Sequence, residues 1–394
     1  MKNKWVFSSP SGGVGREDED KLIMSGNPFS FGVFRNETIR TGDWVRLNAV
    51  CRTQGLASPE TAVTVMLSFY REDRTPVRRQ YILPQPGDEN GQLIFTRVFE
   101  IPGDTKYCVI ELALRWPGAG SVTFDKPVLA ACKPPEKRAA RVAITYFNQF
   151  GNFKESWHDR IHSMVKKINA CDPDLICFCE MLQGNDPEPL DGPFVKLLSQ
   201  SAVKCNAYVI GNFLEADGDL RFNTSVLIDR KGQTAGIYHK THLPLSEVES
   251  GTSPGDTYPV FETDFARIGM LTCWDTSFPD TMKILRENGA ELVVNSTVGD
   301  FWPQDAVRAR DNGLWFAVAG SHRLPSTPIP PSRIFDPSGS LVVATGGDTT
   351  DTFTYTDIDF NRCFFQHWIS VGPCDGEPPS LYRIERRPET YMIN

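Results

Sequence analysis

The sequence predicts an all-β domain followed by an α/β domain. In the first third of the chain, short runs alternate apolar and polar residues and are separated by Pro-Gly pairs. After residue 141, strand-like and helix-like segments alternate. The composition, 40% hydrophobic and 23% charged, is ordinary for a globular protein. At roughly 100–200 residues per domain, the 394 residues allow two or three domains.

Residues 1–132 are expected to form a β-sandwich or jelly roll. Apolar and polar residues alternate in several runs, as they do in half-buried antiparallel strands. Short strand-like runs are predicted from about Trp5 to Cys132, and examples are Trp44 to Cys51, Ala62 to Tyr70, Leu93 to Ile101, Tyr107 to Trp116 and Ser121 to Leu129. Turns are marked by Pro86-Gly87, Pro102-Gly103 and Pro117-Gly118, and no amphipathic helix is expected.

Residues 133–140 combine prolines with charged residues and are expected to form an extended linker. Residues 141–394 are then expected to form the α/β domain. The predicted strands are Arg141 to Tyr146, Leu175 to Cys179, Ala207 to Gly211, Thr224 to Asp229, Arg267 to Cys273, Glu291 to Asn295, Ala317 to Ser321, Ser332 to Asp336, Leu341 to Thr345 and Thr352 to Ile358. The predicted helices are Trp157 to Ala170, Phe278 to Asn288 and Pro303 to Asn312. The last thirty-odd residues, rich in Arg and Pro, are expected to be a tail on this domain or on a partner.

The net charge of −8 argues against nucleic acid as a partner. No apolar run approaches the roughly 18 residues of a membrane span, and no secretory signal is recognisable, so no membrane association is expected. The ten cysteines lack a C-x-x-C spacing, which makes a structural zinc site improbable. Reduced thiols and a cytoplasmic location are the resulting expectation.

Three local patterns carry candidate chemistry. Glu180 ends a buried apolar run, where desolvation would raise its pKa and suit it to proton transfer. Lys240 follows a short strand and could steady a developing oxyanion. Cys273 lies at a strand-to-helix turn, where nearby backbone N–H groups could lower the pKa of its thiol and form an oxyanion hole. Singly, these residues are equally compatible with a solvent-facing glutamate, a surface lysine and one more buried cysteine.

Together, the three residues resemble the Glu–Lys–Cys triad of the nitrilase superfamily of carbon–nitrogen hydrolases. The surrounding motifs are also similar to those of this family, from about residue 141 to residue 361. They are Phe222-Asn-Thr-Ser, Tyr238-His-Lys-Thr-His-Leu, Pro254-Gly-Asp, Cys273-Trp-Asp-x-x-Phe-Pro-Asp and Ala309-Arg-Asp-Asn. Two positions depart from the family pattern: Cys179 replaces the usual proline before the glutamate, and Asp280 replaces a glutamate.

The resemblance implies a four-layer αββα sandwich that forms a homodimer or larger assembly. It also implies a cycle without a metal or organic cofactor, in which Glu180 relays protons and Cys273 forms a thioester. Lys240 and the backbone N–H of Trp274 would hold the oxyanion, and Asn223 would help to bind substrate. The family has a second active-site glutamate, for which Glu249 is favoured over Glu247 because of its spacing to Gly251 and Pro254-Gly255.

The sequence Cys273-Trp274-Asp275 is similar to the amidase and N-carbamoyl-amine branches, which favours a small amide or carbamoyl substrate over a nitrile. Other classes remain open: a cysteine peptidase using His239 or His242, a non-catalytic binding protein, and an amidase that supplies ammonia to a synthetase. A membrane acyltransferase does not fit a chain without spans. The first domain loosely resembles galactose-binding-like sandwiches, and subunit packing or control of access is preferred to sugar binding as its role.

Overall fold

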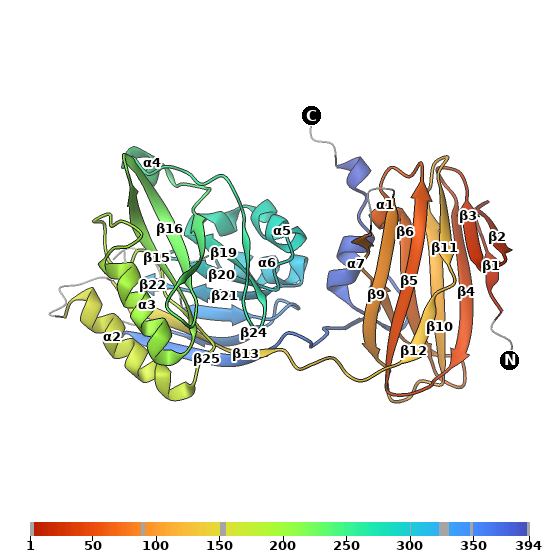
Figure 1. Ribbon diagram of the computed structural model, residues 1–394, viewed down its shortest axis with the longest axis horizontal. Helices are drawn as coiled ribbons and strands as arrows, with labels where there is room; N and C mark the ends of the chain where they lie inside the picture. The colour runs from red at the N-terminus through yellow and green to blue at the C-terminus, as the bar shows by residue number, and fades with distance from the viewer. Residues whose placement is uncertain are drawn as a thin grey trace. The chain divides into compact units, whose positions relative to one another are not determined.

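The computed structural model describes residues 4–87, 91–149, 155–299, 301–322, 331–346 and 350–391. The chain divides into two compact units. The first contains residues 1–136 together with residues 363–394, and the second contains residues 137–362. Figure 1 shows β-strands throughout the first unit and a mixture of strands and helices in the second.

The first unit contains two sheets, which are almost entirely antiparallel. In order of pairing, one sheet contains β1 (Val6–Ser8), β4 (Phe31–Ile39), β10 (Tyr107–Arg115), β6 (Val63–Tyr70), β7 (Pro76–Ile82), β27 (Asp375–Gly376) and β26 (Gln366–His367). The other contains β2 (Val14–Asp18), β3 (Lys21–Ser25), β11 (Ser121–Asp125), β5 (Trp44–Gln54), β9 (Gln92–Glu100) and β8 (Gln85–Pro86), with β12 (Val128–Ala131) also on β5. Apolar residues of both sheets form a single hydrophobic core.

Side-chain alternation explains this core. In β5, Val45, Leu47, Ala49 and Cys51 are buried while most residues between them are exposed. One face of the strand therefore supplies the core, as expected for a period of two residues. The helices of this unit are the short α1 (Pro59–Ala62), α7 (Pro378–Ile384) and the 3₁₀ turn η3 (Pro388–Thr390).

The C-terminal segment differs from the expectation. Residues 363–394 were expected to be a tail of the α/β domain, but they belong to the first unit. β27 pairs with β7 in parallel, at the register Asp375 to Arg78, and β26 pairs with β27. Backbone pairing of this kind needs no long apolar run, so the composition of the segment could not reveal it.

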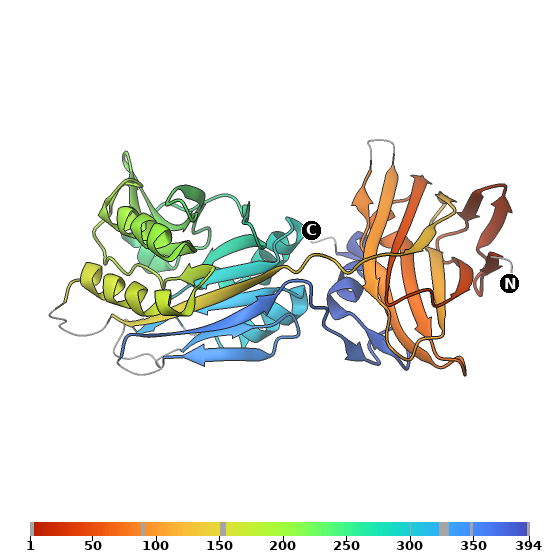
Figure 2. The same cartoon turned by 60° about the horizontal axis from the view of Figure 1, so that its bottom comes forward.

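The second unit also has two sheets. The first contains β17 (Thr234–His239), β16 (Leu220–Ile228), β15 (Tyr208–Asp217), β14 (Leu175–Cys177), β13 (Ala139–Asn148) and β22 (Ser321–His322), with β25 (Thr352–Asp359) also on β13. The second contains β18 (Val260–Glu262), β19 (Arg267–Thr272), β20 (Leu292–Ser296), β21 (Trp315–Ala319), β23 (Ser332–Phe335) and β24 (Leu341–Thr345). Figure 2 shows the yellow β13 beside the antiparallel blue β25.

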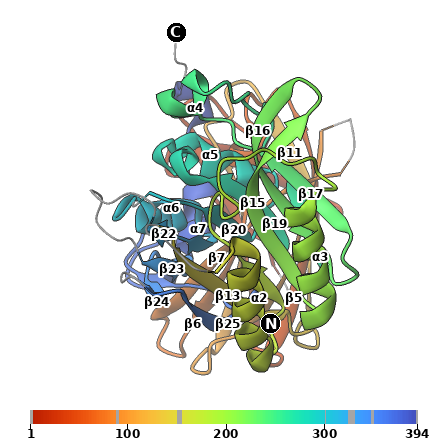
Figure 3. The same cartoon turned by 90° about the vertical axis from the view of Figure 1, so that its left-hand side faces the viewer.

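Helices lie on the two sheets, and the sheets contact each other. β13 packs against β21 and β23, and β16 packs against β19. The helices are α2 (Trp157–Ile168), α3 (Pro193–Cys205), α4 (Leu245–Glu249), α5 (Pro279–Glu287) and α6 (Gln304–Asn312), with 3₁₀ turns η1 (Asn169–Cys171) and η2 (Cys273–Ser277). Figure 3 shows α2 and α3 side by side in front of the first sheet, and α6 packs on β21 and β23. The predicted α/β class is thus confirmed.

Local sequence accounts for α2. Its N-cap residue Ser156 accepts a hydrogen bond from the backbone N–H of Asp159, and apolar side chains then recur at helical spacing. The buried apolar residues of α2 are Ile161, Met164, Val165 and Ile168, and they pack into the core of the first sheet. None of the helices in the described part of the chain is long and apolar enough to cross a membrane.

Candidate functional site

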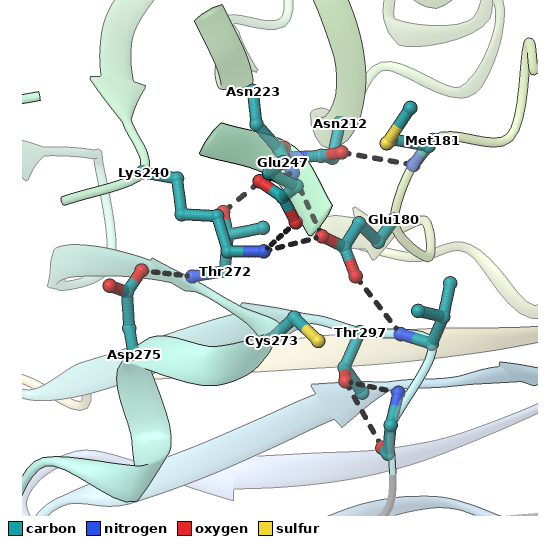
Figure 4. A network of polar contacts seen from close by, with 12 residues as sticks. Glu180, Met181, Asn212, Asn223, Lys240, Glu247, Thr272, Cys273, Asp275 and Thr297 are labelled. Carbon is teal, nitrogen blue, oxygen red and sulfur yellow. Dashed lines mark hydrogen bonds and ion pairs between the residues drawn. The ribbon is translucent and has the colours of Figure 1, made fainter. Parts of the chain in front are cut away.

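Glu180 lies just beyond β14, and its carboxylate is buried, with 2% of the residue exposed. Its Oε1 accepts hydrogen bonds from Lys240 Nζ at 3.0 Å and from Asn223 Nδ2 at 2.9 Å. Its Oε2 accepts one from the backbone N–H of Val298 at 3.1 Å. Figure 4 shows these contacts converging on the carboxylate. The predicted solvent-facing alternative for Glu180 is therefore wrong.

Lys240 follows β17 and is fully buried. Its Nζ lies 3.0 Å from Oε1 of Glu180 and 2.5 Å from Oε1 of Glu247. Burial opposes the charged form of the ammonium, but the negative charges of Glu180 and Glu247, and of Cys273 when it is a thiolate, outweigh burial and raise the pKa of Lys240. Lys240 is therefore a permanent cation at this site, and not a surface lysine.

Glu247, in α4, closes the other side of Lys240. Burial raises the pKa of Glu247, and the charge of Glu180 adds to this effect, while Lys240 acts against it. Asn223 Nδ2 donates to Oε1 of Glu180 and, at 3.3 Å, to Oε2 of Glu247. One amide group thus spans the two carboxylates that flank the lysine.

Glu249 does not reach this cluster, so the preference for Glu249 over Glu247 was wrong. Both residues belong to the short helix α4, but Glu249 is exposed. Two residues of helix correspond to a rotation of about 200°. The side chain of Glu249 therefore leaves α4 on nearly the opposite side from Glu247. The spacing to Gly251 could not distinguish the two positions.

Cys273 lies where β19 meets η2, at a backbone φ of 47°. This left-handed conformation is uncommon for a residue with a side chain and marks a sharp turn after the strand. The backbone N–H of Cys273 donates to Oδ1 of Asn295 at 2.7 Å, which fixes the turn to β20. In Figure 4 the sulfur points toward Thr297. A Cβ atom built on Gly299 would lie 3.6 Å from the sulfur, so this segment lines its other side.

The thiol of Cys273 is not pre-ionised by the turn. Burial raises its pKa to about 12, and the charge of Glu180 adds to the increase, whereas Lys240 and hydrogen bonds from Thr297 and Val298 act against it. The lowered pKa expected at this turn is not found, because burial is the largest influence on the thiol. Burial thus favours the protonated thiol, and the Glu180 carboxylate is a nearby group that can accept its proton.

Asp275 is fully buried and connects the segment that carries Lys240 to the Cys273 turn. Its Oδ2 accepts from the backbone N–H of Thr272 at 3.0 Å and from the Tyr238 hydroxyl at 2.7 Å. Its Oδ1 accepts from the backbone N–H of His242 at 2.9 Å. The Tyr-x-Lys-x-His and Cys-Trp-Asp motifs are therefore two halves of one hydrogen-bonded structure.

The glycine of the Pro254-Gly-Asp motif is required for a steric reason. The backbone N–H of Gly255 donates to the carbonyl of Lys240 at 2.9 Å. A Cβ atom at Gly255 would lie 2.2 Å from the carbonyl oxygen of His239, which is impossible without moving the backbone. Glycine is thus required for this segment to approach the lysine.

Beside the cluster lies a cavity of about 390 Å³. Its lining residues are Glu180, Met181, Asn185, Leu214, Arg221, Asn223, Ser246, Glu247, Ser250, Thr252 and Val298. This volume accommodates a small molecule, and the lining includes the carboxylates of Glu180 and Glu247. Trp274, the residue after Cys273, is 41% exposed and contacts the rings of Phe278 and Phe301.

The two histidines of the peptidase alternative are engaged elsewhere. His239 stacks on Phe222 and contacts Glu215 at 3.0 Å. His242 stacks on Phe278 and contacts Asp275 at 3.1 Å. The structure therefore surrounds Cys273 with a carboxylate and an ammonium instead of an imidazole.

Sequence reasoning missed several residues that build the site. Asn212 holds Asn223 through a 2.8 Å hydrogen bond to its Oδ1, and also accepts from the backbone N–H of Met181. Asn295 fixes Cys273, and Thr297 and Val298 line the sulfur. A signal existed for Asn212 and Asn295, because a polar residue inside an otherwise apolar strand needs a buried partner.

The chain is similar to known proteins over the second unit. The carbon-nitrogen hydrolase family profile matches residues 141–364. A probable nitrilase of Schizosaccharomyces pombe is 29% identical over 206 residues, 49% of this chain and 74% of that protein. A beta-ureidopropionase of Arabidopsis thaliana is 34% identical over 157 residues, 36% of this chain and 38% of that protein.

Among solved structures, a double mutant of the amidase from Nesterenkonia sp. AN1, in complex with acrylamide, has a TM-score of 0.52 and 19% identity. The alignment covers 66% of this chain and 98% of the amidase. At this level of identity the similarity concerns the fold.

Proposed function

Because this chain belongs to the carbon–nitrogen hydrolase family, as its motifs predicted, we propose that Cys273 is the nucleophile, Glu180 the proton carrier and Lys240 the oxyanion stabiliser. The chain is a carbon–nitrogen hydrolase. The observation that carries the assignment is a buried carboxylate, ammonium and thiol placed together, with Lys240 Nζ 3.0 Å from Glu180 Oε1.

The proposed cycle begins with a proton transfer. The neutral thiol of Cys273 gives its proton to Glu180 as the sulfur attacks the carbonyl carbon of the substrate. The ammonium of Lys240 and the backbone N–H of Trp274 stabilise the oxyanion that forms. Glu180 then protonates the leaving nitrogen, the C–N bond breaks, and a thioester remains on Cys273. Glu180 next takes a proton from water, and the water oxygen attacks the thioester carbon. The C–S bond then breaks, the acid is released, and Glu180 returns the proton to the sulfur of Cys273.

The raised pKa values support these roles. A thiol whose pKa is raised to about 12 needs a base in order to react at neutral pH, and the Glu180 carboxylate fills that need. A lysine whose pKa is raised stays charged and can stabilise an anion through the whole cycle. Glu247 is proposed as a positioning residue that holds Lys240.

We propose small amides or N-carbamoyl compounds as substrates. The similarity to a beta-ureidopropionase supports this class, and Asp275 follows Trp274 as in amidase-type motifs. Nitriles are the alternative substrate class for the same site, in keeping with the probable nitrilase among the relatives.

For the whole molecule, we propose a four-layer αββα hydrolase domain and an accessory β-sandwich domain that serves in packing or access. A cytoplasmic homodimer or larger assembly is part of the proposal. All ten cysteines are free thiols, which suits a reducing compartment. Ile284 on α5 and Val307 on α6 are exposed apolar residues that a second copy could cover. A monomeric mass in light scattering would contradict the assembly.

The test is ammonia release from a panel of small amides, N-carbamoyl compounds and nitriles. Cys273→Ala should lose at least about 10³-fold in kcat, because no other group can form the acyl intermediate. Cys171→Ala is the matched control, since Cys171 lies in η1 and donates only to the backbone of Ile168. Turnover that survives in Cys273→Ala would overturn the assignment.

A further inference from the structure

A second cavity, of about 270 Å³, lies within the first unit. It is formed by the segment before β4, the segment around α1, the turn after β10 and the segment after α7, and α1 contacts α7 (Figure 1). The lining residues are Pro28, Gly55, Leu56, Ala57, Ser58, Thr61, Ala62, Arg115, Trp116, Pro117, Gly118 and Arg387. Small-molecule sites have volumes of roughly 300–1,000 Å³, so this cavity suits a small ligand.

The lining of this cavity carries positive charge. It includes Arg115 and Arg387, and none of the described residues that line it is acidic. The guanidinium of Arg115 is held by backbone carbonyls. Its Nε and Nη2 donate to the carbonyl of Thr61 at 3.2 Å and 2.5 Å, and Nη2 also donates to the carbonyl of Ile384 at 2.6 Å. These contacts fix the orientation of the side chain without neutralising its charge.

The pKa values of two arginines in this unit differ in direction. Burial lowers the pKa of Arg115, and the charges of Glu385 and of ionised Tyr81 offset this effect only in part. Burial also acts against the charged form of Arg97, but the ion pair with Glu377 outweighs burial and raises the pKa of Arg97. A partly buried charge without a counter-charge is unfavourable. An anion in the cavity would supply the counter-charge that Arg115 lacks.

Two polar groups of the lining are available to such an anion. Nη1 of Arg115 donates to no residue in the described part of the chain. The Nε atoms of Arg78 and Arg79 also lack an acceptor and are sealed from solvent, whereas Nη1 of Arg115 is not sealed. Ser58 is the N-cap residue of α1, but its side chain makes no capping hydrogen bond. A guanidinium donor and a hydroxyl can therefore both bond to a ligand oxygen.

Trp116 adds a flat apolar surface to the lining. It has a backbone φ of 48°, which is uncommon for a residue with a side chain, and it is 43% exposed. The guanidinium carbon of Arg387 lies 4.6 Å from the centre of its ring, and that of Arg115 lies 5.5 Å away. A guanidinium stacked on a ring keeps its N–H donors directed outward in its own plane. Leu56 and Ala62 extend the apolar part of the lining.

We propose that this cavity binds a small organic acid, with its carboxylate on Arg115 and its apolar body beside Trp116 and Leu56. Charge-assisted hydrogen bonds from a guanidinium are among the strong contacts that a carboxylate makes. Inorganic phosphate has no apolar part and would leave the ring and Leu56 without a partner. The cavity belongs to the first unit, so this role is independent of the chemistry proposed for Cys273.

The first test is titration calorimetry of the full chain with benzoate, benzyl alcohol and inorganic phosphate. Benzoate should bind with one-to-one stoichiometry, and about tenfold to hundredfold more tightly than benzyl alcohol, the size of a hydrogen bond to a charged group. Benzyl alcohol has the same ring without the charge, and it contains no amide or nitrile to be hydrolysed. Phosphate should bind more weakly than benzoate. Equal affinities for benzoate and benzyl alcohol, tighter binding of phosphate, or no binding of benzoate would overturn the proposal.

The second test locates the benzoate. Trp116→Asn should weaken benzoate binding by at least about fivefold, since stacking on an aromatic ring is lost while asparagine tolerates the left-handed backbone. Trp368→Asn is the matched control, because Trp368 is 66% exposed, has a φ of 61° and belongs to the same unit, but does not line the cavity. Benzoate affinity that fell equally in both variants, or in neither, would contradict the site.

A charge variant completes the test. Arg387→Gln should weaken benzoate binding by about tenfold and leave benzyl alcohol unchanged, because it removes a cation and keeps the Arg115 bonds to Thr61 and Ile384. Arg46→Gln, at an exposed position of β5, is its control. Benzoate could instead enter the cavity beside Glu180. An affinity that changed in Glu247→Gln and stayed at the wild-type value in Arg387→Gln would place it there and overturn the proposal.

Discussion

At the scale of single residues, the site contains more acidic groups than basic ones. Two carboxylates, Glu180 and Glu247, contact one ammonium, Lys240, in a buried place. Burial raises the pKa of Glu247, and the neighbouring charge of Glu180 adds to this effect. The two carboxylates therefore hold Lys240 between them.

Glu247→Gln should reduce kcat by about tenfold to a thousandfold, the range for loss of one oriented polar contact at an active site. The reason is that Lys240 loses its 2.5 Å contact and is no longer held against the oxyanion position. KM should change less than kcat. The measurement is steady-state ammonia release on the best substrate of the panel.

The adjacent glutamate offers a control on the same helix. Glu249→Gln removes an exposed charge and should leave kcat within about twofold, the size of ordinary surface substitutions. If Glu249→Gln were the more damaging change, the placement of Glu247 at the site would be contradicted.

The three main site residues could be predicted from sequence because each belongs to a local motif. Glu180 ends an apolar strand, Lys240 follows one, and Cys273 lies at a turn. The choice between Glu247 and Glu249 could not be made, since it depends on which side of α4 faces Lys240. The state of the Cys273 thiol also needed the structure, because burial and the neighbouring Glu180 determine its pKa.

At the scale of elements, two segments must be held together for the site to exist. The Lys240 segment follows β17 in one sheet, and the Cys273 turn follows β19 in the other. Asp275 accepts hydrogen bonds from Thr272 and Tyr238, one residue from each segment. A single buried carboxylate thus links the two sheets at the point where chemistry is proposed.

Asp275→Asn should lower kcat by about tenfold to a hundredfold, because an amide has one acceptor oxygen where the carboxylate has two. Either the backbone N–H of His242, which bonds Oδ1, or the Thr272 N–H and the Tyr238 hydroxyl, which share Oδ2, would then face the amide NH2 instead of an acceptor, so Lys240 and Cys273 would move relative to each other. Asp280→Asn, at an exposed position in the first turn of α5, is the control. Steady-state kinetics would contradict this role for Asp275 if KM rose and kcat did not fall.

Most elements of the second unit could be predicted, and the exceptions are informative. The helix α3 was not predicted although Phe194, Leu197, Leu198 and Ser201 follow helical spacing. Its Gly192-Pro193 start resembles a turn, yet proline at the first helical position is favourable. The helical spacing of α3 is therefore present in the sequence, and its Gly192-Pro193 pair marks the start of the helix and not a turn.

In the first unit, the apolar–polar pattern does not single out β1 and β2. β2 has no buried residue, and β1 has only one partly buried residue, so neither shows apolar alternation. β1 is held by backbone pairing to the sequence-distant β4, and β2 by pairing to the adjacent β3. Local patterns carry little information about pairing of this kind.

At the scale of the whole molecule, the chain leaves the first unit once and returns to it. Residues 363–394 complete that unit through β26, β27 and α7. Arg97 of β9 forms a two-pronged contact with Glu377, at 2.7 Å and 2.9 Å. Burial opposes the charged carboxylate, but Arg97 outweighs it and lowers the pKa of Glu377.

Glu377→Gln should destabilise the first unit by about 3 kcal/mol, because it leaves the largely buried Arg97 without its counter-charge.

The pH dependence of this stabilisation has a definite sign. Since the pKa of Glu377 is lowered in the folded protein, the stabilisation is present at neutral pH and is lost as pH falls through the folded-state pKa. At pH 7, hydrogen exchange in peptides of β7 and β9 should be faster in Glu377→Gln than in wild type. Asp18→Asn, whose partner Arg16 is exposed and 4.0 Å away, should change exchange little. If Glu377→Gln left the exchange of β9 at the wild-type rate, the returning segment would contribute little stability to the unit it joins.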